Sequence, residues 1–389
     1  MAEEVLSPKL QEYINSIIKR EGYLTHKLTA KTLPADGSGF MGVLNTIDIQ
    51  GKTAVGDKET HIFIKNLIPN PEEMKIYSAR DVFSRESFVY TELSKKITEL
   101  QNEANIPEKE RYKMIKSFEE CNPEAIILEN ITYKGFKQCS RMDVVSLEFA
   151  ELAISLLAKF HALSYVLKEN DPNFFEEKIR SLKQPFFFGE AWDGFTTNIF
   201  RSTVALLDKD VRDKYEDKLL QMIKKFPDYI NNATTFGTLC YSDYRHGNIM
   251  VKDTDNTLEI MPLDYQHIHY GCPVHDLIYF IFIGTDQDFR KKHLSHLKNL
   301  YYDTMEHFLR YFSININSIW TKQDFENVFA EKLAFGLIIN FCFTPVIFAA
   351  VDDIPSVTNS LSELSFKTDA RFAPRIRGTV EDFINWGYL

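Results

Sequence analysis

The sequence predicts an α+β protein of two lobes, a small strand-rich N-terminal lobe and a larger, mainly helical C-terminal lobe. Alternating apolar and β-branched residues gather between residues 40 and 68, whereas apolar residues at helical spacing dominate after residue 146. The boundary falls near Glu129–Lys134. We therefore expect lobes of residues 1–130 and 131–389, with a ligand-binding cleft between them.

The N-terminal lobe is expected to contain helices at both ends of a strand pair. Residues 8–22 predict the first helix. Alternating apolar positions predict strands at Val43–Ile49 and His61–Lys65, joined by a polar turn through Gly51–Lys58. Residues 71–100 carry apolar residues at helical spacing and predict one long helix.

The C-terminal lobe is expected to follow a third strand, Ala125–Leu128. Ser146 is a suitable N-cap for a long helix that runs through Lys168, with acidic residues in its first turn. The remaining chain has mostly helical patterns, apart from short strands around residues 248–252 and 258–263.

One apolar run, Leu333–Val351, has about the length that crosses a bilayer. It contains Asn340 and Pro345 and is flanked by charged residues. We therefore expect a buried helix broken near Pro345, and no membrane span.

Composition excludes some functions and favours a compartment. The formal net charge of −10 disfavours nucleic acid as a partner, because binding to phosphates needs a basic surface. The five cysteines form no C-x-x-C pair, which favours reduced thiols over disulfides or structural zinc. The first residues show no signal-peptide pattern, so we expect a cytoplasmic protein, and we expect it to be a monomer.

Three residues have the order and spacing of a phosphotransfer site. Asn248 follows Asp243 by five residues, and Asp264 follows the predicted hairpin. In the protein-kinase fold the first Asp orients or deprotonates the attacking hydroxyl, and the Asn and second Asp hold Mg²⁺. The hairpin should bring Asn248 and Asp264 together, and hard oxygen ligands favour Mg²⁺ or Mn²⁺ over zinc. A polar turn followed by an ordinary hairpin is the alternative.

Two N-terminal features would complete a nucleotide site. Gly37, Gly39 and Gly42 match G-x-G-x-x-G ahead of a strand pair, where glycine lets backbone N–H groups approach a phosphate. A surface turn is the alternative. Lys65 ends a strand, and Glu86 lies on the inward face of the long helix, where an unpaired carboxylate is costly. These positions predict an ion pair between Lys65 and Glu86.

For four further residues near these motifs the sequence indicates a role less specifically. Arg85 is a competing partner for the helix carboxylate. Arg245 suits either phosphate neutralisation or a structural contact. Asp276 is expected to cap an apolar helix and to brace the catalytic loop. His161 is expected to be a hydrogen-bonded core residue rather than a metal ligand.

With these motifs the sequence resembles the ecdysteroid kinase-like family, in the choline-kinase and aminoglycoside-phosphotransferase branch of the protein-kinase-like fold. The resemblance covers about residues 36–350. It implies ATP and Mg²⁺, and phosphate transfer to a hydroxyl group of a small molecule. Glu129, at the lobe boundary, becomes a candidate nucleotide-binding residue. The motifs that carry the resemblance are Phe83–Tyr90, Leu128–Ile131 with Lys134–Phe136, Leu157–Ala162, Ser242–Met250, Leu263–Gln266, and Tyr270–Pro273 with Asp276–Leu277.

The chain departs from the family pattern near the catalytic residue. The family usually has His-Gly before the catalytic Asp, where this chain has Tyr241 and Ser242. The missing histidine normally braces the loop, so its loss could lower activity. Other departures are Asn130 for Asp, Tyr265 for Phe, Arg245 for Trp, and Gly247 for Asn. None of them removes a metal ligand or the catalytic base.

These features predict an ATP- and Mg²⁺-dependent small-molecule O-kinase, with Asp243 catalytic, Asn248 and Asp264 on the metal, and Lys65 on the phosphates. The expected acceptor is an ecdysteroid-like or xenobiotic alcohol, bound against the helical lobe. The 31 Phe and 18 Tyr residues suit a broad apolar ligand, and equally an aromatic-rich core. The alternative is a weak or inactive pseudokinase that binds a nucleotide or a steroid.

Overall fold

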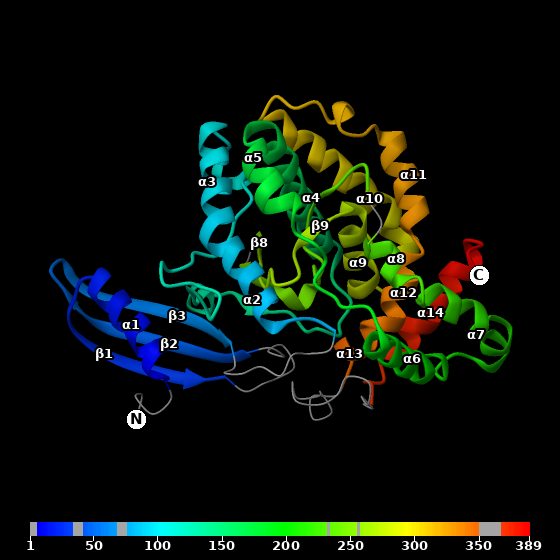
Figure 1. The fold of residues 1–389 in the computed structure, drawn as a ribbon, viewed down its shortest axis with the longest axis horizontal. Helices are drawn as coiled ribbons and strands as arrows, with labels where there is room; N and C mark the ends of the chain where they lie inside the picture. The colour runs from blue at the N-terminus through cyan, green and yellow to red at the C-terminus, as the bar shows by residue number, and fades with distance from the viewer. Residues whose placement is uncertain (1–5, 34–41, 68–75, 232–233, 255–256, 350–366) are drawn as a thin grey trace.

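A small sheet and a larger group of helices form the two parts of the molecule in a computed structural model (Figure 1). The structure describes residues 6–33, 42–67, 76–231, 234–254, 257–349 and 367–389. This arrangement confirms the predicted α+β class, with strands concentrated in the N-terminal part and helices in the C-terminal part.

The N-terminal sheet has four antiparallel strands in the order β1-β2-β3-β4. Isoleucines alternate along β2 and β3 with one face of each strand buried, and each buried side chain contributes about 1.5–3 kcal/mol. The first helix, α1 (Pro8–Arg20), packs on this sheet and ends two residues before the predicted limit (Figure 1). The strands are β1 (Tyr23–Thr32), β2 (Gly42–Thr53), β3 (Gly56–Leu67) and β4 (Ala125–Glu129).

Both predicted strands of the pair are present, but the predicted turn is wrong. The strands continue through most of Gly51–Lys58, so that only Ala54 and Val55 join Thr53 to Gly56. The sequence did not predict β1 at all. Its side chains are mostly exposed, so its sequence lacks the apolar alternation that marks a half-buried strand.

The long N-terminal helix begins later than predicted. It starts at Ala79, after the N-cap Ser78, and comprises α2 (Ala79–Phe88), a π-helical turn at Val89–Leu93, and α3 (Ser94–Glu103). The predicted start, residues 71–75, lies outside the described residues. Wide turns of this kind occur often near functional sites.

Helices make up most of the C-terminal part. The predicted helix after Ser146 is confirmed as α4 (Leu147–Asn170), which packs along α10. The other helices are α5 (Pro172–Phe174), α6 (Glu190–Val204), α7 (Lys209–Ile223), α8 (Phe226–Asn231), α9 (Pro273–Gly284), α10 (Gln287–Arg310), α11 (Lys322–Lys332), α12 (Phe335–Cys342), α13 (Thr344–Ile347) and α14 (Phe372–Asn385), with a π-helical turn at Phe175–Arg180 and 3₁₀ turns at Glu108–Glu110, Ile131–Lys134, His246–Asn248 and Ile316–Ser318.

The apolar run near the C-terminus forms buried helices, as predicted. The chain breaks at Phe343 between α12 and α13, two residues before Pro345, and residues 350–351 lie outside the described residues. Among the described residues one helix, α4, is long and apolar enough by composition to cross a membrane. In that helix 78% of the apolar window is buried in the structure.

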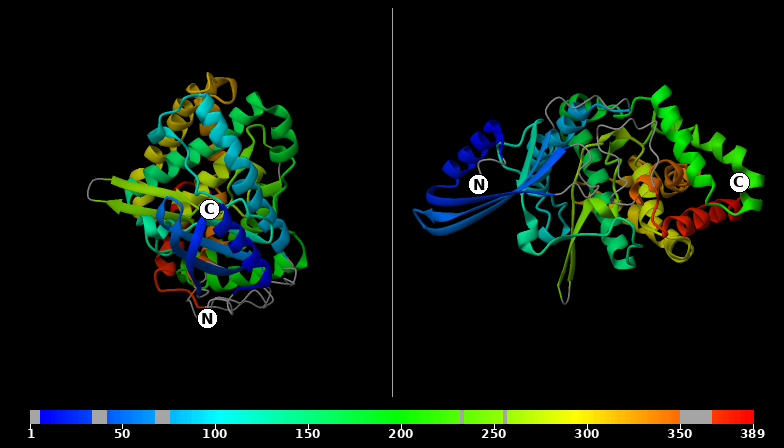
Figure 2. Two further views of the ribbon diagram at one scale, coloured as in Figure 1. Left: turned by 90° about the vertical axis from the view of Figure 1, so that its left-hand side faces the viewer. Right: turned by 90° about the horizontal axis from the view of Figure 1, so that it is seen from below.

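Two small sheets hold the predicted site. Strands β5 (Lys137–Gln138), β7 (Ile249–Thr254) and β8 (Thr257–Pro262) form one, and the β7–β8 hairpin extends away from the helices (Figure 2). Strand β6 (Thr238–Cys240) pairs with β9 (His269–Gly271) in the other. The predicted catalytic loop therefore lies between the ends of β6 and β7.

Candidate active site

Lys65 and Glu86 form the predicted ion pair. The Lys65 Nζ atom lies 2.8 Å from Glu86 Oε2, and both side chains are buried. Strand β3 supplies the lysine and α2 the glutamate, because Glu86 is on the face of α2 that packs toward the sheet. Arg85 does not compete, since it pairs with Asp81 and donates to the carbonyls of Lys183 and Ile268.

The Lys65 ammonium also contacts two residues of the C-terminal part. It donates to Asp264 Oδ1 and to Gln266 Oε1, each at 2.9 Å. Burial acts to lower the pKa of Lys65, but the charges of Asp264 and Glu86 outweigh it and leave the pKa raised. Burial raises the pKa of Glu86 to about 7 in spite of its pairing with Lys65. Three acceptors thus surround one cation.

Asp243 is buried in the segment between β6 and β7 and accepts hydrogen bonds from three side chains. Asn248 Nδ2 donates to Oδ2 at 2.7 Å, while the Tyr279 hydroxyl and Arg245 Nε donate to Oδ1 at 2.7 and 3.1 Å. Burial raises the pKa of Tyr279, and the charge of Asp243 raises it further, so the hydroxyl keeps its proton. These donors hold one carboxylate in a single orientation.

The hairpin brings Asn248 and Asp264 to the same end, as predicted. Ile249 pairs with Pro262, and the Leu263 N–H donates to the Asn248 carbonyl at 2.8 Å. Asp264 has a φ of 65°, in the left-handed region that non-glycine residues seldom adopt. Such strain of about 1–3 kcal/mol is often found at functional sites.

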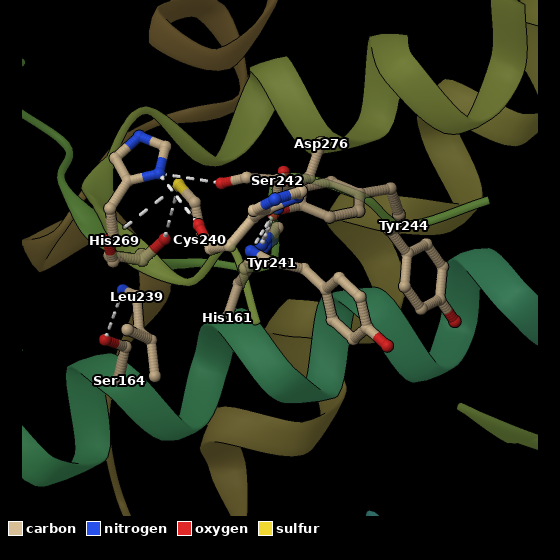
Figure 3. Close-up of polar contacts among 12 residues, drawn as sticks. His161, Ser164, Leu239, Cys240, Tyr241, Ser242, Tyr244, His269 and Asp276 are labelled. Carbon is tan, nitrogen blue, oxygen red and sulfur yellow. Dashed lines mark hydrogen bonds and ion pairs between the residues drawn. The ribbon is translucent and has the colours of Figure 1, made fainter. Parts of the chain in front are cut away.

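Asp276 braces the backbone of the loop, as predicted. Its carboxylate accepts from the N–H groups of Tyr241 and Ser242, the second at 2.8 Å (Figure 3). His161 Nε2 lies 3.0 Å from the same carboxylate, and His161 Nδ1 lies 2.7 Å from the Tyr301 hydroxyl. The predicted cap is wrong, because Cys272 occupies the N-cap position of α9 and Asp276 points to the loop instead.

His161, Cys240 and Asp276 lie close enough to share a metal ion by distance alone. The side chains of His161 and Asp276 already form hydrogen bonds, however. They are hydrogen-bonded to each other, and Asp276 also accepts hydrogen bonds from two backbone N–H groups. We therefore interpret the cluster as a brace for the loop, in line with the core role predicted for His161.

A cavity of about 390 Å³ adjoins the predicted site. Its polar lining includes Lys65, Glu86, Asn248 and Asp264, but most of its lining surface is apolar. The apolar lining comes from strands β2, β3 and β4 and from the C-terminal part, with Leu44, Phe63, Ile126, Leu128, Met250 and Leu263 among its residues.

The other predicted nucleotide-binding residues have different outcomes. Gly37 and Gly39 lie outside the described residues. Gly42 begins β2, and a Cβ atom there would come 2.5 Å from the Asn66 carbonyl oxygen. Glu129 lines the cavity, but its carboxylate pairs with Lys134 at 2.7 Å and its N–H donates to the Lys116 carbonyl at 2.9 Å.

Sequence reasoning missed Tyr279 and Gln266. Tyr279 lies three residues after Asp276 on α9, and a helical-wheel comparison would have placed both on the face that meets the loop. Gln266 belongs to the Leu263–Gln266 motif, but the sequence indicated no role for its side chain. No local pattern links it to Lys65, which lies 201 residues away in the chain.

Comparisons with known proteins identify a family and similar solved structures. The model of the ecdysteroid kinase-like family matches residues 36–314. No curated protein matches the chain. An ethanolamine kinase of Plasmodium vivax is 12% identical, with 98% of this chain and 91% of that chain covered and a TM-score of 0.42. A microcompartment-associated aminopropanol kinase is 10% identical, with 96% and 98% covered and a TM-score of 0.39. At these TM-scores the solved structures carry no argument about the acceptor.

Proposed function

Since the chain belongs to the ecdysteroid kinase-like family and so to the small-molecule kinases, we propose that it transfers phosphate from ATP to a hydroxyl group of a small molecule. The observation that carries this proposal is the meeting of two sets of residues at one cavity. Lys65 and Glu86 come from the N-terminal sheet and helix, and Asn248 and Asp264 from the C-terminal hairpin.

The lining of the cavity fits a nucleotide. The apolar side chains suit a planar base, and the Lys65 ammonium suits its phosphates. We propose that the base lies near the backbone of Glu129, at the junction between residues 1–130 and 131–389. Gly42, at the start of β2, has no side chain that would keep a phosphate away from the backbone. We propose that it belongs, with Gly37 and Gly39, to the loop that covers the phosphates.

The donor set also fits Mg²⁺. Asn248 uses its Nδ2 atom to hold Asp243, which leaves its side-chain oxygen as a ligand, and Asp264 supplies carboxylate oxygens. When bound, the ion offsets the negative charge of the transferring phosphoryl group.

We propose that Asp243 orients the acceptor hydroxyl and takes its proton. Asn248, Tyr279 and Arg245 restrict the carboxylate to one orientation, which reduces the freedom that must be lost at the moment of reaction. Arg245 keeps its positive charge beside Asp243. It therefore serves as a structural contact, and we propose that it also offsets charge on the phosphate.

Half-buried aromatic residues beside the site support an apolar acceptor. His267, three residues after Asp264, contacts Tyr77 and Phe186 with ring centroids 6.0 and 5.5 Å apart. Burial lowers the pKa of His267, the charges of Asp243 and Asp264 act to raise it, and those of Lys65 and Arg85 act to lower it. Phe188 and Phe343 extend the same group of rings. We propose an ecdysteroid-like or xenobiotic alcohol as the acceptor.

The test is ATP consumption by the purified protein with Mg²⁺ and a panel of ecdysteroids, other sterols and plant phenolics. We expect a phosphorylated product with at least one apolar alcohol. Asp243→Asn should lower kcat by about 10²–10⁴, because it removes a positioned base while keeping the shape of the side chain.

Two outcomes would contradict this proposal. A loss of less than about tenfold in Asp243→Asn would remove Asp243 from the role of base. Stabilisation by ATP and Mg²⁺ without turnover of any acceptor would favour a binding protein that has lost catalysis.

A further inference from the structure

Ser242, directly before Asp243, has an unfavourable backbone conformation. Its φ is 69°, in the left-handed region where a Cβ atom is crowded by the backbone. Glycine, which lacks a Cβ atom, would adopt this conformation without crowding. A serine at this position therefore needs contacts that favour its conformation.

Two contacts hold Ser242 in place. Its N–H donates to Asp276 Oδ1 at 2.8 Å, and its hydroxyl shares a hydrogen bond of 2.7 Å with His269 Nδ1 (Figure 3). The first contact needs only the backbone N–H, which every residue except proline would supply at position 242. The second depends on the serine hydroxyl and on the histidine ring.

His269 is itself firmly placed. It is 5% exposed, and it pairs with Cys240 across the β6–β9 ladder, two residues before Ser242. The His269 Nδ1 atom also lies 3.4 Å from the His267 carbonyl. Gly271 leaves room for the ring, since a Cβ atom there would come 2.8 Å from Nε2. The ring is therefore a rigid support for the residue that precedes Asp243.

We propose that His269 and Ser242 form a positioning pair that fixes the backbone of the catalytic loop and thereby the direction of the Asp243 carboxylate. This inference rests on the proposed function. Neither residue touches the reacting atoms. The pair braces the loop from β9.

The test compares Ser242→Ala, His269→Leu and their combination with the unaltered protein. Each single substitution should lower kcat about tenfold, because small displacements of a catalytic group are costly. The KM for ATP should stay within about twofold, since the nucleotide contacts lie elsewhere. The double variant should lose no more than about twofold beyond either single variant, because the two changes remove one interaction.

Two further variants separate the hydrogen bond from the backbone strain. Ser242→Gly removes the bond but also the crowding, so it should retain kcat within about threefold. His269→Asn keeps a polar group near the Nδ1 position and should recover most of the activity that His269→Leu loses. Ser313→Ala is the matched control, because Ser313 also has a positive φ, of 58°, and lies between α10 and α11.

Amide hydrogen exchange gives a readout that does not depend on turnover. Peptides covering residues 238–248 should exchange faster in Ser242→Ala and His269→Leu than in the unaltered protein and Ser313→Ala. Faster exchange without phosphotransfer in any protein would support the pair and contradict the proposed function. Unchanged exchange, or kcat losses that multiply in the double variant, would overturn the pair.

Discussion

At the scale of single residues, the orientation of the Asp243 carboxylate is fixed by hydrogen bonds from three side chains. Its oxygens accept from an amide, a phenol and a guanidinium, which come from its own loop and from α9. Of these donors, Tyr279 can be altered with the least disturbance, because it loses only a hydroxyl on substitution by phenylalanine.

Tyr279→Phe should lower kcat about tenfold, because a hydrogen bond to a charged group is worth about 1.5–3 kcal/mol. The KM for ATP should change little, since Tyr279 is not among the residues that line the described cavity. Steady-state kinetics would measure both constants.

The matched control is Tyr165→Phe, which also loses a buried hydroxyl. Tyr165 donates to the Phe236 carbonyl, away from the Asp243 carboxylate, so kcat should be unchanged. Equal losses of kcat in the two variants would mean that the effect of Tyr279→Phe is on stability alone.

At the scale of elements, the Lys65–Glu86 pair connects β3 to α2 inside the protein. A buried charge is tolerated while it is paired and becomes costly when its partner is removed. Glu86 is therefore the group that would suffer most from the loss of Lys65, whereas Asp264 is more exposed to solvent.

Lys65→Met should destabilise the protein by about 3 kcal/mol at pH 8, because it leaves the Glu86 carboxylate buried without a cation. Adding Glu86→Leu should recover most of this loss, since the double variant buries no charge at that position. Both variants should lose the increase in Tm that ATP and Mg²⁺ produce. Chemical denaturation and thermal shift would measure these effects, and equal stability of the single and double variants would contradict the explanation.

At the scale of the whole molecule, buried histidines make stability depend on pH. Burial lowers the pKa of His246 and His269 to about 4 and that of His275 to about 3, from 6.5. Because the pKa is lower in the folded state, the unfolded chain binds more protons below pH 6.5. The contribution of these histidines to stability is therefore fully present above this pH and is lost as the pH falls toward 4.

We expect Tm to fall between pH 6.5 and 4.5, with each of these histidines costing on the order of 2 kcal/mol at the lower pH. His275→Phe should reduce the fall, because the ring already packs against Phe335 with centroids 4.6 Å apart and would no longer take up a proton. Thermal denaturation of both proteins at the two pH values measures the difference, to which unaltered carboxylates contribute equally. An identical fall in both proteins would assign the effect to other groups.

The grouping of the candidate site residues was predictable because most of them are close together in the sequence. Asp243, Asn248 and Asp264 lie within one loop and one hairpin, and Lys65 and Glu86 follow from a strand end and a helix face. The contact from Tyr279 was predictable in principle, because Tyr279 lies about one turn after Asp276 on α9. The contacts of His269 with Ser242 and of Gln266 with Lys65 were not, since they join residues 27 and 201 positions apart in the chain. Strand β1 escaped prediction for the opposite reason, because its mostly exposed surface leaves no apolar pattern.

The ammonium of Lys65 has three N–H groups, and Glu86, Asp264 and Gln266 accept one each. A phosphate oxygen that reaches this cation must therefore replace an acceptor that is already there, so nucleotide binding is an exchange of partners. Gln266 is the only neutral member of the three and the one whose release separates no charges. The measured affinity for a nucleotide therefore depends on the difference in free energy between the Lys65–phosphate contact and the Lys65–Gln266 hydrogen bond that it replaces. A substitution at Gln266 should change this affinity even though Gln266 does not contact the nucleotide.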